Sequence, residues 1–243
     1  MKDPLKLVSL NIEGNRHLAE VPEFVRREQA DVVFFYEVLD HAFPALESAL
    51  GMKGIYVPIS RVAVPKGSAS FVKWGSAFFS RLPPKDLTIS YYSGTPDALP
   101  EEQIDNVLGI NRCLLSAIVE KDGERFSLGA THFTWSADGK ATDPQRGDLK
   151  KFLKILEGFP EIILYGDFNA PRGREIFDAI AARYKDAIPP EYKTSLDGKF
   201  HRAGQLPFMV DGLFTTPGYR AQNVRLVSGL SDHCAVVGDI YCV

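Results

Sequence analysis

The sequence predicts an α/β fold, a four-layered sandwich of two stacked mixed β-sheets flanked by helices. Short apolar runs rich in β-branched residues alternate with amphipathic stretches, which indicates strands and helices within one chain. Several neighbouring strands are joined directly by turns, as at Asp122-Gly123, where an Asp-Gly pair favours a hairpin. Strict alternation of strands and helices would instead predict a purely parallel sheet. Two mixed sheets, packed face to face with the helices outside, account for both patterns.

Length and composition are those of an ordinary globular protein. The 243 residues are 45% hydrophobic and 24% charged, enough to bury a sizeable core, and we expect one domain spanning residues 1–243. The net charge of -3 argues against a generic polyanion binder. Three widely spaced cysteines form no metal-binding motif, and no stretch approaches the ~20 apolar residues of a membrane span. Since a signal peptide is also missing, we expect a cytoplasmic monomer without a membrane span.

The first half of the chain predicts two strand–helix pairs followed mainly by strands. Leu5–Leu10 alternates partly and indicates a strand, and Leu18–Ala30 begins with the acidic residues and proline that suit a first helical turn. Val32–Tyr36 is a continuous apolar strand that ends in a carboxylate, and Asp40–Leu50 predicts a second helix. The other expected elements are strands at Ile55–Ile59, Gly75–Ser80 and Leu87–Tyr92, a loop or irregular hairpin at Arg61–Lys73 and an exposed excursion at Ser93–Asn106.

The second half of the chain begins with a hairpin and contains the clearest helix. Cys113–Val119 and Arg125–Ala130 are its strands, and Thr142–Leu156 places apolar residues at helical spacing behind a proline in the first turn. Ile162–Tyr165 is too short for a helix and reads as a buried strand. The remaining elements are a short helix at Arg172–Arg183, a loop-rich stretch at Tyr184–Pro207, and strands at Phe208–Thr216, Ala221–Val227 and Cys234–Val243.

A carboxylate and an amide follow the buried strand Ile162–Tyr165. Asp167 and Asn169 have the same parity, so both side chains point the same way if the chain stays extended. Such a pair suits gripping a phosphate and activating water, but a turn that caps the next helix explains the same residues equally well. Other strand ends add polar residues along the same predicted edge. These residues are Asn11, Glu37, His132, Asp211, Asp232 and His233.

The order of these motifs resembles the endonuclease/exonuclease/phosphatase superfamily, which includes pancreatic deoxyribonuclease and the abasic-site endonucleases. The matching motifs are Leu10-Asn11, Tyr36-Glu37, Thr131-His132, Gly166-Asp167-Phe168-Asn169, Val210-Asp211-Gly212 and Ser231-Asp232-His233. Tyr36 departs from the glutamine that the superfamily usually has, and no acidic partner for His132 is evident near Trp74–Ser80. The resemblance covers nearly the whole chain and implies a single catalytic domain that hydrolyses phosphoesters with Mg²⁺, which Mn²⁺ can replace.

The resemblance also implies a role for each matching residue. Metal ligands would be Glu37, with Asn11 as a neutral neighbour and Asp232 holding a metal-bound water or a second ion. Asp167 would orient or deprotonate the attacking water, while Asn169 fixes that geometry. His233 would donate to a phosphate oxygen, with Asp211 as its buried partner, and His132 would be a second phosphate donor. Arg112 would grip the phosphate, although an ion pair at the strand edge explains it about as well.

The sequence leaves the substrate open. A nuclease acting on DNA or RNA is the first interpretation, and a phosphatase or phosphodiesterase of a small-molecule, lipid or inositol phosphate is the alternative. A non-catalytic phosphate-binding module of the same fold is a third. A serine hydrolase is excluded, because Ser231, Asp232 and His233 are adjacent and cannot align as a relay. A modest basic rim for a nucleic acid backbone is predicted from Arg172, Arg174, Lys193, Lys199 and Arg202.

Overall fold

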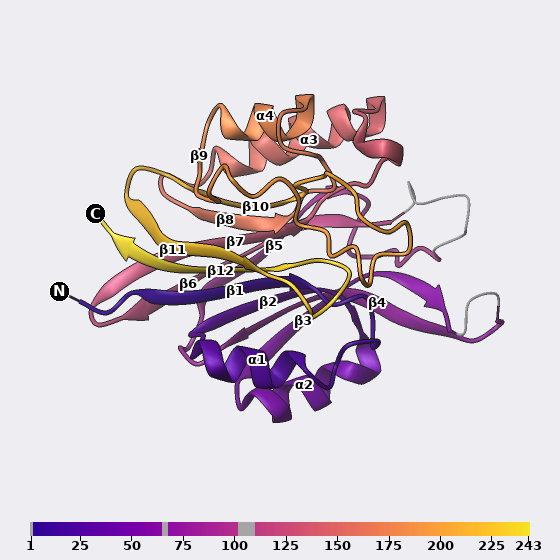
Figure 1. The fold of residues 1–243 in the computed structure, drawn as a ribbon, viewed down its shortest axis with the longest axis horizontal. Coiled ribbons are helices and arrows are strands. Elements are labelled where there is room, and N and C mark those ends of the chain that lie inside the picture. Colours follow the sequence, from indigo (N-terminus) through magenta and orange to yellow (C-terminus); the bar gives the residue numbers. More distant parts are fainter. Residues whose placement is uncertain (1, 65–67, 102–109) are drawn as a thin grey trace.

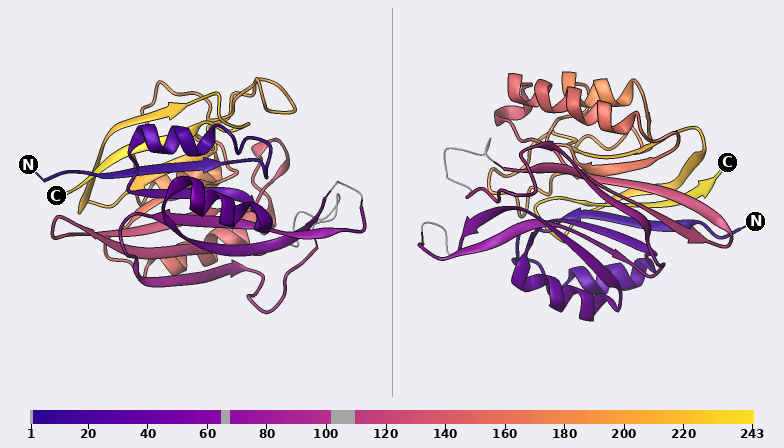
Figure 2. Two further views of the ribbon diagram at one scale, coloured as in Figure 1. Left: turned by 90° about the horizontal axis from the view of Figure 1, so that it is seen from below. Right: turned by 180° about the vertical axis from the view of Figure 1, so that it is seen from behind.

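Two mixed sheets of six strands each stack face to face, and helices cover the outer face of each sheet (Figure 1). The structure is a computed structural model that describes residues 2–64, 68–101 and 110–243. Figure 2 shows the same layers from below and from behind, and the predicted four-layered sandwich is confirmed. The covering helices are α1 (Val21–Glu28) and α2 (Phe43–Leu50) on the first sheet, and α3 (Asp143–Leu156) and α4 (Glu175–Ala181) on the second.

The first sheet has the strand order β11-β12-β1-β2-β4-β3. β1 runs parallel to β2, whereas the other neighbouring strands of this sheet are antiparallel. Its strands are β1 (Leu5–Asn11), β2 (Val32–Leu39), β3 (Lys53–Ala63), β4 (Phe71–Ser80), β11 (Tyr219–Val227) and β12 (Ala235–Cys242). Because β1 and β2 are parallel, their carboxyl ends meet at the same edge of the sheet.

The second sheet has the strand order β5-β6-β7-β8-β10-β9. β7 runs parallel to β8, and the other neighbours are antiparallel. Its strands are β5 (Lys85–Ser93), β6 (Arg112–Lys121), β7 (Glu124–His132), β8 (Ile163–Asp167), β9 (Lys185–Asp186) and β10 (Asp211–Thr215). The sheet therefore also gathers the ends of two parallel strands at one edge.

The main core lies between the two sheets. Along β2, Phe34 and Tyr36 belong to this core, while Val33 and Phe35 pack into a second core beneath α1 and α2. The rings of Phe34 and Tyr165 meet across the sheets with centroids 4.7 Å apart. Since successive strand residues face opposite sides, a strand covered on both faces must be apolar throughout. This explains the continuous apolar runs in the sequence.

Two expected segments are present but differ in detail from the expectation. The stretch Arg61–Lys73 continues two paired strands, with Arg61 opposite Lys73 and Ala63 opposite Phe71, so the hairpin alternative holds and the loop does not. The predicted helix at Asp40–Leu50 begins with the short 3₁₀ helix η1 (Asp40–Ala42). Of the excursion Ser93–Asn106, residues 102–106 lie outside the described residues. In the described ranges, no helix is both long enough and apolar enough to cross a membrane.

Candidate active site

Polar residues from both sheets meet at one edge of the sandwich, beyond the ends of the parallel strands. Asn11 ends β1, and Glu37 lies in the last part of the neighbouring β2. In the second sheet, Asp167 at the end of β8 is paired with His132 on one side and with Asp211 on the other. The segment before β12 adds Asp232 and His233. Both termini lie at the opposite end of the sandwich (Figure 1).

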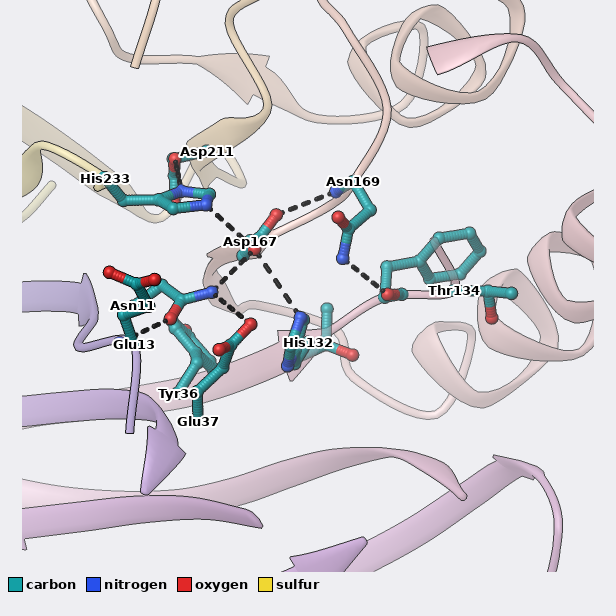
Figure 3. A network of polar contacts seen from close by, with 12 residues as sticks. Asn11, Glu13, Tyr36, Glu37, His132, Thr134, Asp167, Asn169, Asp211 and His233 are labelled. Carbon is teal, nitrogen blue, oxygen red and sulfur yellow. Dashed lines mark hydrogen bonds and ion pairs between the residues drawn. The ribbon is translucent and has the colours of Figure 1, made fainter. Parts of the chain in front are cut away.

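Asp167 is the centre of the cluster (Figure 3). Its carboxylate is 1% exposed and accepts hydrogen bonds from Asn11 Nδ2 at 3.2 Å and from the Asn169 backbone N–H at 2.9 Å. The Nε2 atoms of His132 and His233 lie 3.5 and 3.7 Å from Oδ2. Burial raises the pKa of Asp167 to about 6, although the charge of His233 opposes this rise. The carboxylate is thus a base whose pKa lies near neutrality.

Asp211 and His233 form a buried ion pair beside Asp167. Nδ1 of His233 lies 2.8 Å from Oδ2 of Asp211, which leaves Nε2 directed at Asp167. Burial by itself disfavours a charged imidazole. The nearby carboxylates of Asp211 and Asp167 outweigh that penalty and raise the pKa of His233 well above its usual value. The ring is therefore a protonated donor at neutral pH.

Glu37 of the first sheet lies close to other acidic residues of the site. Its Oε1 accepts a hydrogen bond of 2.9 Å from Asn11 Nδ2. The pKa of Glu37 is raised to about 7 by burial, with Asp232 and Asp167 adding repulsion that the Asn11 hydrogen bond partly offsets. Oxygen donors that repel one another in this way suit a hard divalent cation.

Asn11 joins the carboxylates of the two sheets. Its Nδ2 contacts both Glu37 and Asp167, and its Oδ1 accepts the backbone N–H of Glu13 at 3.1 Å. In this geometry Asn11 orients the carboxylates of Glu37 and Asp167. The Glu13 N–H occupies one lone pair of the Asn11 oxygen. Glu13 was missed in the sequence, although Asn11 and Glu13 repeat the two-residue spacing of Asp167 and Asn169. The Glu13 carboxylate is contacted by Arg16 and, at 3.2 Å, by His17 Nε2.

Three residues of the site have left-handed backbone conformations. The φ angles are 62° at Glu37, 49° at Glu13 and 50° at Asn169. Such conformations cost non-glycine residues on the order of 1–3 kcal/mol and cluster at functional sites. Glu37 lies where the pairing of β2 with β4 shifts register between Phe35 and Val38, as it does at a β-bulge. A bulge redirects a side chain, and here it presents Glu37 at the sheet edge.

Asn169 belongs to a turn that holds its side chain beside Asp167. Its backbone N–H donates to Asp167 Oδ1, and its Nδ2 donates to the Phe133 carbonyl at 3.0 Å. The predicted turn is therefore present. It does not cap the next helix, because α4 begins at Glu175 with Arg174 as its N-cap residue. The turn instead fixes the amide beside Asp167.

His132 is a buried ring with aromatic neighbours. Its ring centroid lies 5.5 Å from that of Trp74 and 5.9 Å from that of Tyr36. Burial, followed by the charges of Arg112 and His233, lowers the pKa of His132 well below its usual value. Nδ1 has no hydrogen-bond partner among the described residues. The sequence showed no acidic partner for His132 near Trp74–Ser80. In the structure the ring of Trp74 packs against His132 there.

Tyr36, the departure from the family pattern, is a core residue. Its hydroxyl accepts from Ser9 Oγ at 3.2 Å and lies 3.4 Å from the carbonyl oxygen of Tyr165, to which it donates. The side chain thus bridges the two sheets beneath Asp167. The substitution leaves the neighbouring carboxylate of Glu37 in the site.

Arg112 lies behind His132 and is 2% exposed. Its Nη1 donates to the His132 carbonyl at 3.1 Å, and within the described ranges its Nε has no partner and its guanidinium no carboxylate within ion-pair distance. Burial lowers the pKa of Arg112. The strand-edge ion pair considered above is therefore not seen among the described residues, and a buried cation remains close to the site.

The basic rim expected from the sequence is largely engaged in other contacts. Arg172 pairs with Asp186 at 2.7 Å and donates to the Ile188 carbonyl, so it holds the segment after β9 in place. Arg174 lies over the ring of Phe208, and Lys193 donates to a backbone carbonyl. Lys199 and Arg202 are exposed. Of the five residues of the predicted basic rim, three are thus engaged in contacts within the protein and two are exposed.

Comparisons with known proteins agree with this architecture. The model of the Endonuclease/Exonuclease/phosphatase family matches residues 8–233. An endonuclease/exonuclease/phosphatase from Bacteroides vulgatus is 18% identical with a TM-score of 0.75, covering 100% of both chains. A mannosyl-6-phosphatase from Bacteroides thetaiotaomicron is 16% identical, with a TM-score of 0.71 over 98% of this chain and 99% of that one. TDP2 of D. rerio, complexed with a single-stranded DNA product, is 17% identical with a TM-score of 0.71, covering 98% of each chain. No curated protein matches the sequence.

Proposed function

This chain belongs to the endonuclease/exonuclease/phosphatase family, and from that premise we propose that it is a Mg²⁺-dependent phosphodiesterase acting on DNA or RNA. Members of the family are generally phosphoester hydrolases that depend on a divalent metal. The observation that carries the proposal is the buried Asp167, held between Asn11 of one sheet and the two histidines of the other. We propose that residues 1–243 form one catalytic domain.

A carboxylate with a pKa near neutrality suits the activation of water. We propose that Asp167 orients or deprotonates the attacking water, because its pKa of about 6 leaves it ionised at neutral pH yet still basic. Asn169, fixed by its bond to the Phe133 carbonyl, keeps the water aligned. A tightly held side chain places the nucleophile in line with the phosphorus.

Two histidines face the charge that develops on the phosphate, and a buried arginine lies behind them. His233, held protonated by Asp211, donates from Nε2 to a phosphate oxygen. His132, kept neutral by burial and by Arg112, donates as an uncharged ring. The guanidinium of Arg112 has an unpartnered Nε among the described residues and supplies positive charge behind them. Donors fixed before the reaction need no reorganisation during it, which is why they accelerate it.

Glu37, Asp232 and the oxygen of Asn11 would hold Mg²⁺, for which Mn²⁺ can substitute. The bound ion would supply a Lewis acid for the phosphate and neutralise the acidic cluster. The structure also gathers Asp167, Asp211 and His233 within 4.8 Å of one another. We assign that group to the ion pair and the base, because Nδ1 of His233 is already occupied by Asp211.

The Mg²⁺ affinity should depend on pH through Glu37. A metal ligand must lose its proton before it binds. Below the Glu37 pKa of about 7, each fall of one pH unit should therefore weaken Mg²⁺ binding about tenfold, and above that pKa the affinity should level off. Calorimetry in two buffers of different ionisation enthalpy should show proton release below pH 7. Glu37→Gln should weaken Mg²⁺ binding and remove this pH dependence while the fold is kept. An unchanged affinity in that variant would place the metal elsewhere.

A phosphatase or phosphodiesterase of a small-molecule, lipid or inositol phosphate is the second candidate. It is favoured by the engagement of the rim residues Arg172 and Arg174 in contacts within the protein. The mannosyl-6-phosphatase among the structures of the same fold also favours it. The single-stranded DNA bound to TDP2 favours the nuclease. A binding module is disfavoured, because binding alone does not require a base beside a protonated donor.

A panel assay tests the proposal. The substrates are plasmid DNA, abasic duplex, RNA, bis-nitrophenyl phosphate, inositol phosphates and a hexose 6-phosphate, each with Mg²⁺. Cleavage of a nucleic acid supports the nuclease, and turnover of monoesters alone supports the second candidate. Binding without turnover of any substrate would support the non-catalytic binding module.

We also propose a cytoplasmic location, which is supported by three cysteines that are free thiols.

A further inference from the structure

The segment 194–197 lies against both chain segments that carry the Asp211–His233 pair. Ser195 is fully buried, yet it belongs to the loop-rich stretch that precedes β10. Its Oγ accepts two hydrogen bonds of 3.0 Å, from the backbone N–H groups of Val210 and Asp211. One hydroxyl oxygen thus fixes the main chain at the residue where β10 begins.

The backbone of the same segment pairs with the residues on either side of His233. The Ser195 carbonyl accepts the N–H of Cys234 at 2.7 Å, and Leu196 forms an antiparallel bridge with His233. The N–H of Asp197 donates to the Asp232 carbonyl at 2.8 Å. The segment therefore runs alongside residues 232–234 like a short added strand.

We propose that Ser195 is a positioning residue that sets the distance between Asp211 and His233 by bonding to both of their chain segments. The inference rests on the proposed function, in which this pair supplies a donor to the phosphate. Ser195 touches neither the substrate site nor the reacting atoms. It acts through the backbone of Asp211 on one side and of Cys234 on the other.

The geometry explains why a side-chain hydroxyl is needed here. The N–H groups of Val210 and Asp211 both donate to the Ser195 oxygen, and all three residues are buried, so solvent offers these groups little alternative. Without the Ser195 oxygen, both buried donors lose their acceptor, and the chain must shift to satisfy them. A shift at Asp211 moves the carboxylate that lies 2.8 Å from His233 Nδ1.

Ser195→Ala should lower kcat by ~10–10²-fold with little change in KM, because misplacing a catalytic group by a fraction of an ångström mainly affects the transition state. Ser195→Thr keeps the acceptor oxygen and should retain more of the wild-type kcat than the alanine variant. The assay uses whichever phosphoester the wild-type protein hydrolyses.

Two controls separate positioning from loss of stability. Thr194→Val removes a hydroxyl from the same segment. That hydroxyl bonds to the Phe208 carbonyl and to the Leu196 N–H, but not to Asp211 or His233. Ser60→Ala removes a fully buried hydroxyl that has no partner among the described residues. Both variants should keep the wild-type kcat. Equal losses of kcat in Ser195→Ala and Thr194→Val would overturn the proposal.

A second readout does not depend on activity. At fixed pH, the NMR signal of the His233 Nδ1 proton reports the hydrogen bond to Asp211, and Ser195→Ala should shift or broaden it while Thr194→Val should not. An unchanged signal in Ser195→Ala overturns the proposal even if no substrate is found. Absence of turnover by the wild-type protein, by contrast, speaks only against the proposed function.

Should Ser195→Ala fail to fold, the wild-type protein still provides a test. Amide hydrogen exchange at Val210 and Asp211 should be as slow as in the middle of β10, because the Ser195 oxygen holds both N–H groups. Exchange as fast as in the exposed residues near Arg202 would overturn the proposal.

Discussion

Asp167→Asn should lower turnover at least ~10²–10³-fold, because the attacking water would lose both its position and its base. Asparagine has nearly the same shape but cannot take a proton. It can also still accept the Asn169 N–H at Oδ1, so the fold should persist. Substrate affinity should change far less than turnover, since the contact strengthens mainly at the transition state. Single-turnover hydrolysis of a phosphodiester, with circular dichroism as the check on folding, measures the loss.

His233→Ala should cost a similar ~10²–10³-fold, the typical loss when one donor aimed at the transition state is removed. Residues that act as one unit are not additive, so the double variant should be little worse than the worse single variant. The 3.7 Å between His233 Nε2 and Asp167 Oδ2 is the structural reason to treat them as one unit.

Asp31→Asn is the matched control. Asp31 is a partly buried carboxylate that pairs with Lys121 at 2.7 Å, next to the start of β2 and away from the site edge. This variant should keep wild-type turnover. If folded Asp167→Asn or His233→Ala retains more than about a tenth of wild-type turnover, well above the ~10²-fold loss expected, the catalytic site lies elsewhere.

Removal of divalent cations with EDTA should abolish turnover, and Mg²⁺ or Mn²⁺ should restore it. The pKa of Glu37 is raised mainly by burial and further by repulsion from Asp232 and Asp167, so without a cation an anionic phosphate would approach a group of acidic residues. The assay is hydrolysis after chelation and after return of excess metal. Full activity in metal-free buffer would rule out the proposed mechanism.

The same metal should stabilise the folded protein independently of catalysis. A ligand that binds only the native state raises the free energy of unfolding in proportion to the logarithm of its concentration over Kd. Thermal unfolding of the wild-type protein should therefore shift upward with Mg²⁺, and that of Glu37→Gln should shift less. Equal shifts in both proteins would mean that the stabilising cation binds away from Glu37.

The sequence alone determined the fold class and the edge at which the polar residues gather. Both follow from local periodicity: Val32–Tyr36 and Ile162–Tyr165 are apolar throughout because each strand is covered on both faces. A carboxylate within two residues of the end of such a run must lie near the end of a buried strand, as Glu37 and Asp167 do. The helix at Asp143–Leu156 was equally evident from its spacing.

Only the tertiary structure decided which of these residues touch and in which protonation state. Asn11 and Asp167 are 156 residues apart in the chain, and their hydrogen bond exists because the two sheets stack with the same edge aligned. The pKa of Asp167 and that of His132 depend on burial and on neighbouring charges, which no single stretch of sequence contains. Packing likewise places Arg172, which binds the segment after β9. It also places Ser195, which bonds to the chain segments that carry Asp211 and His233. Periodicity is a property of neighbours in sequence, whereas these contacts are made by neighbours in space.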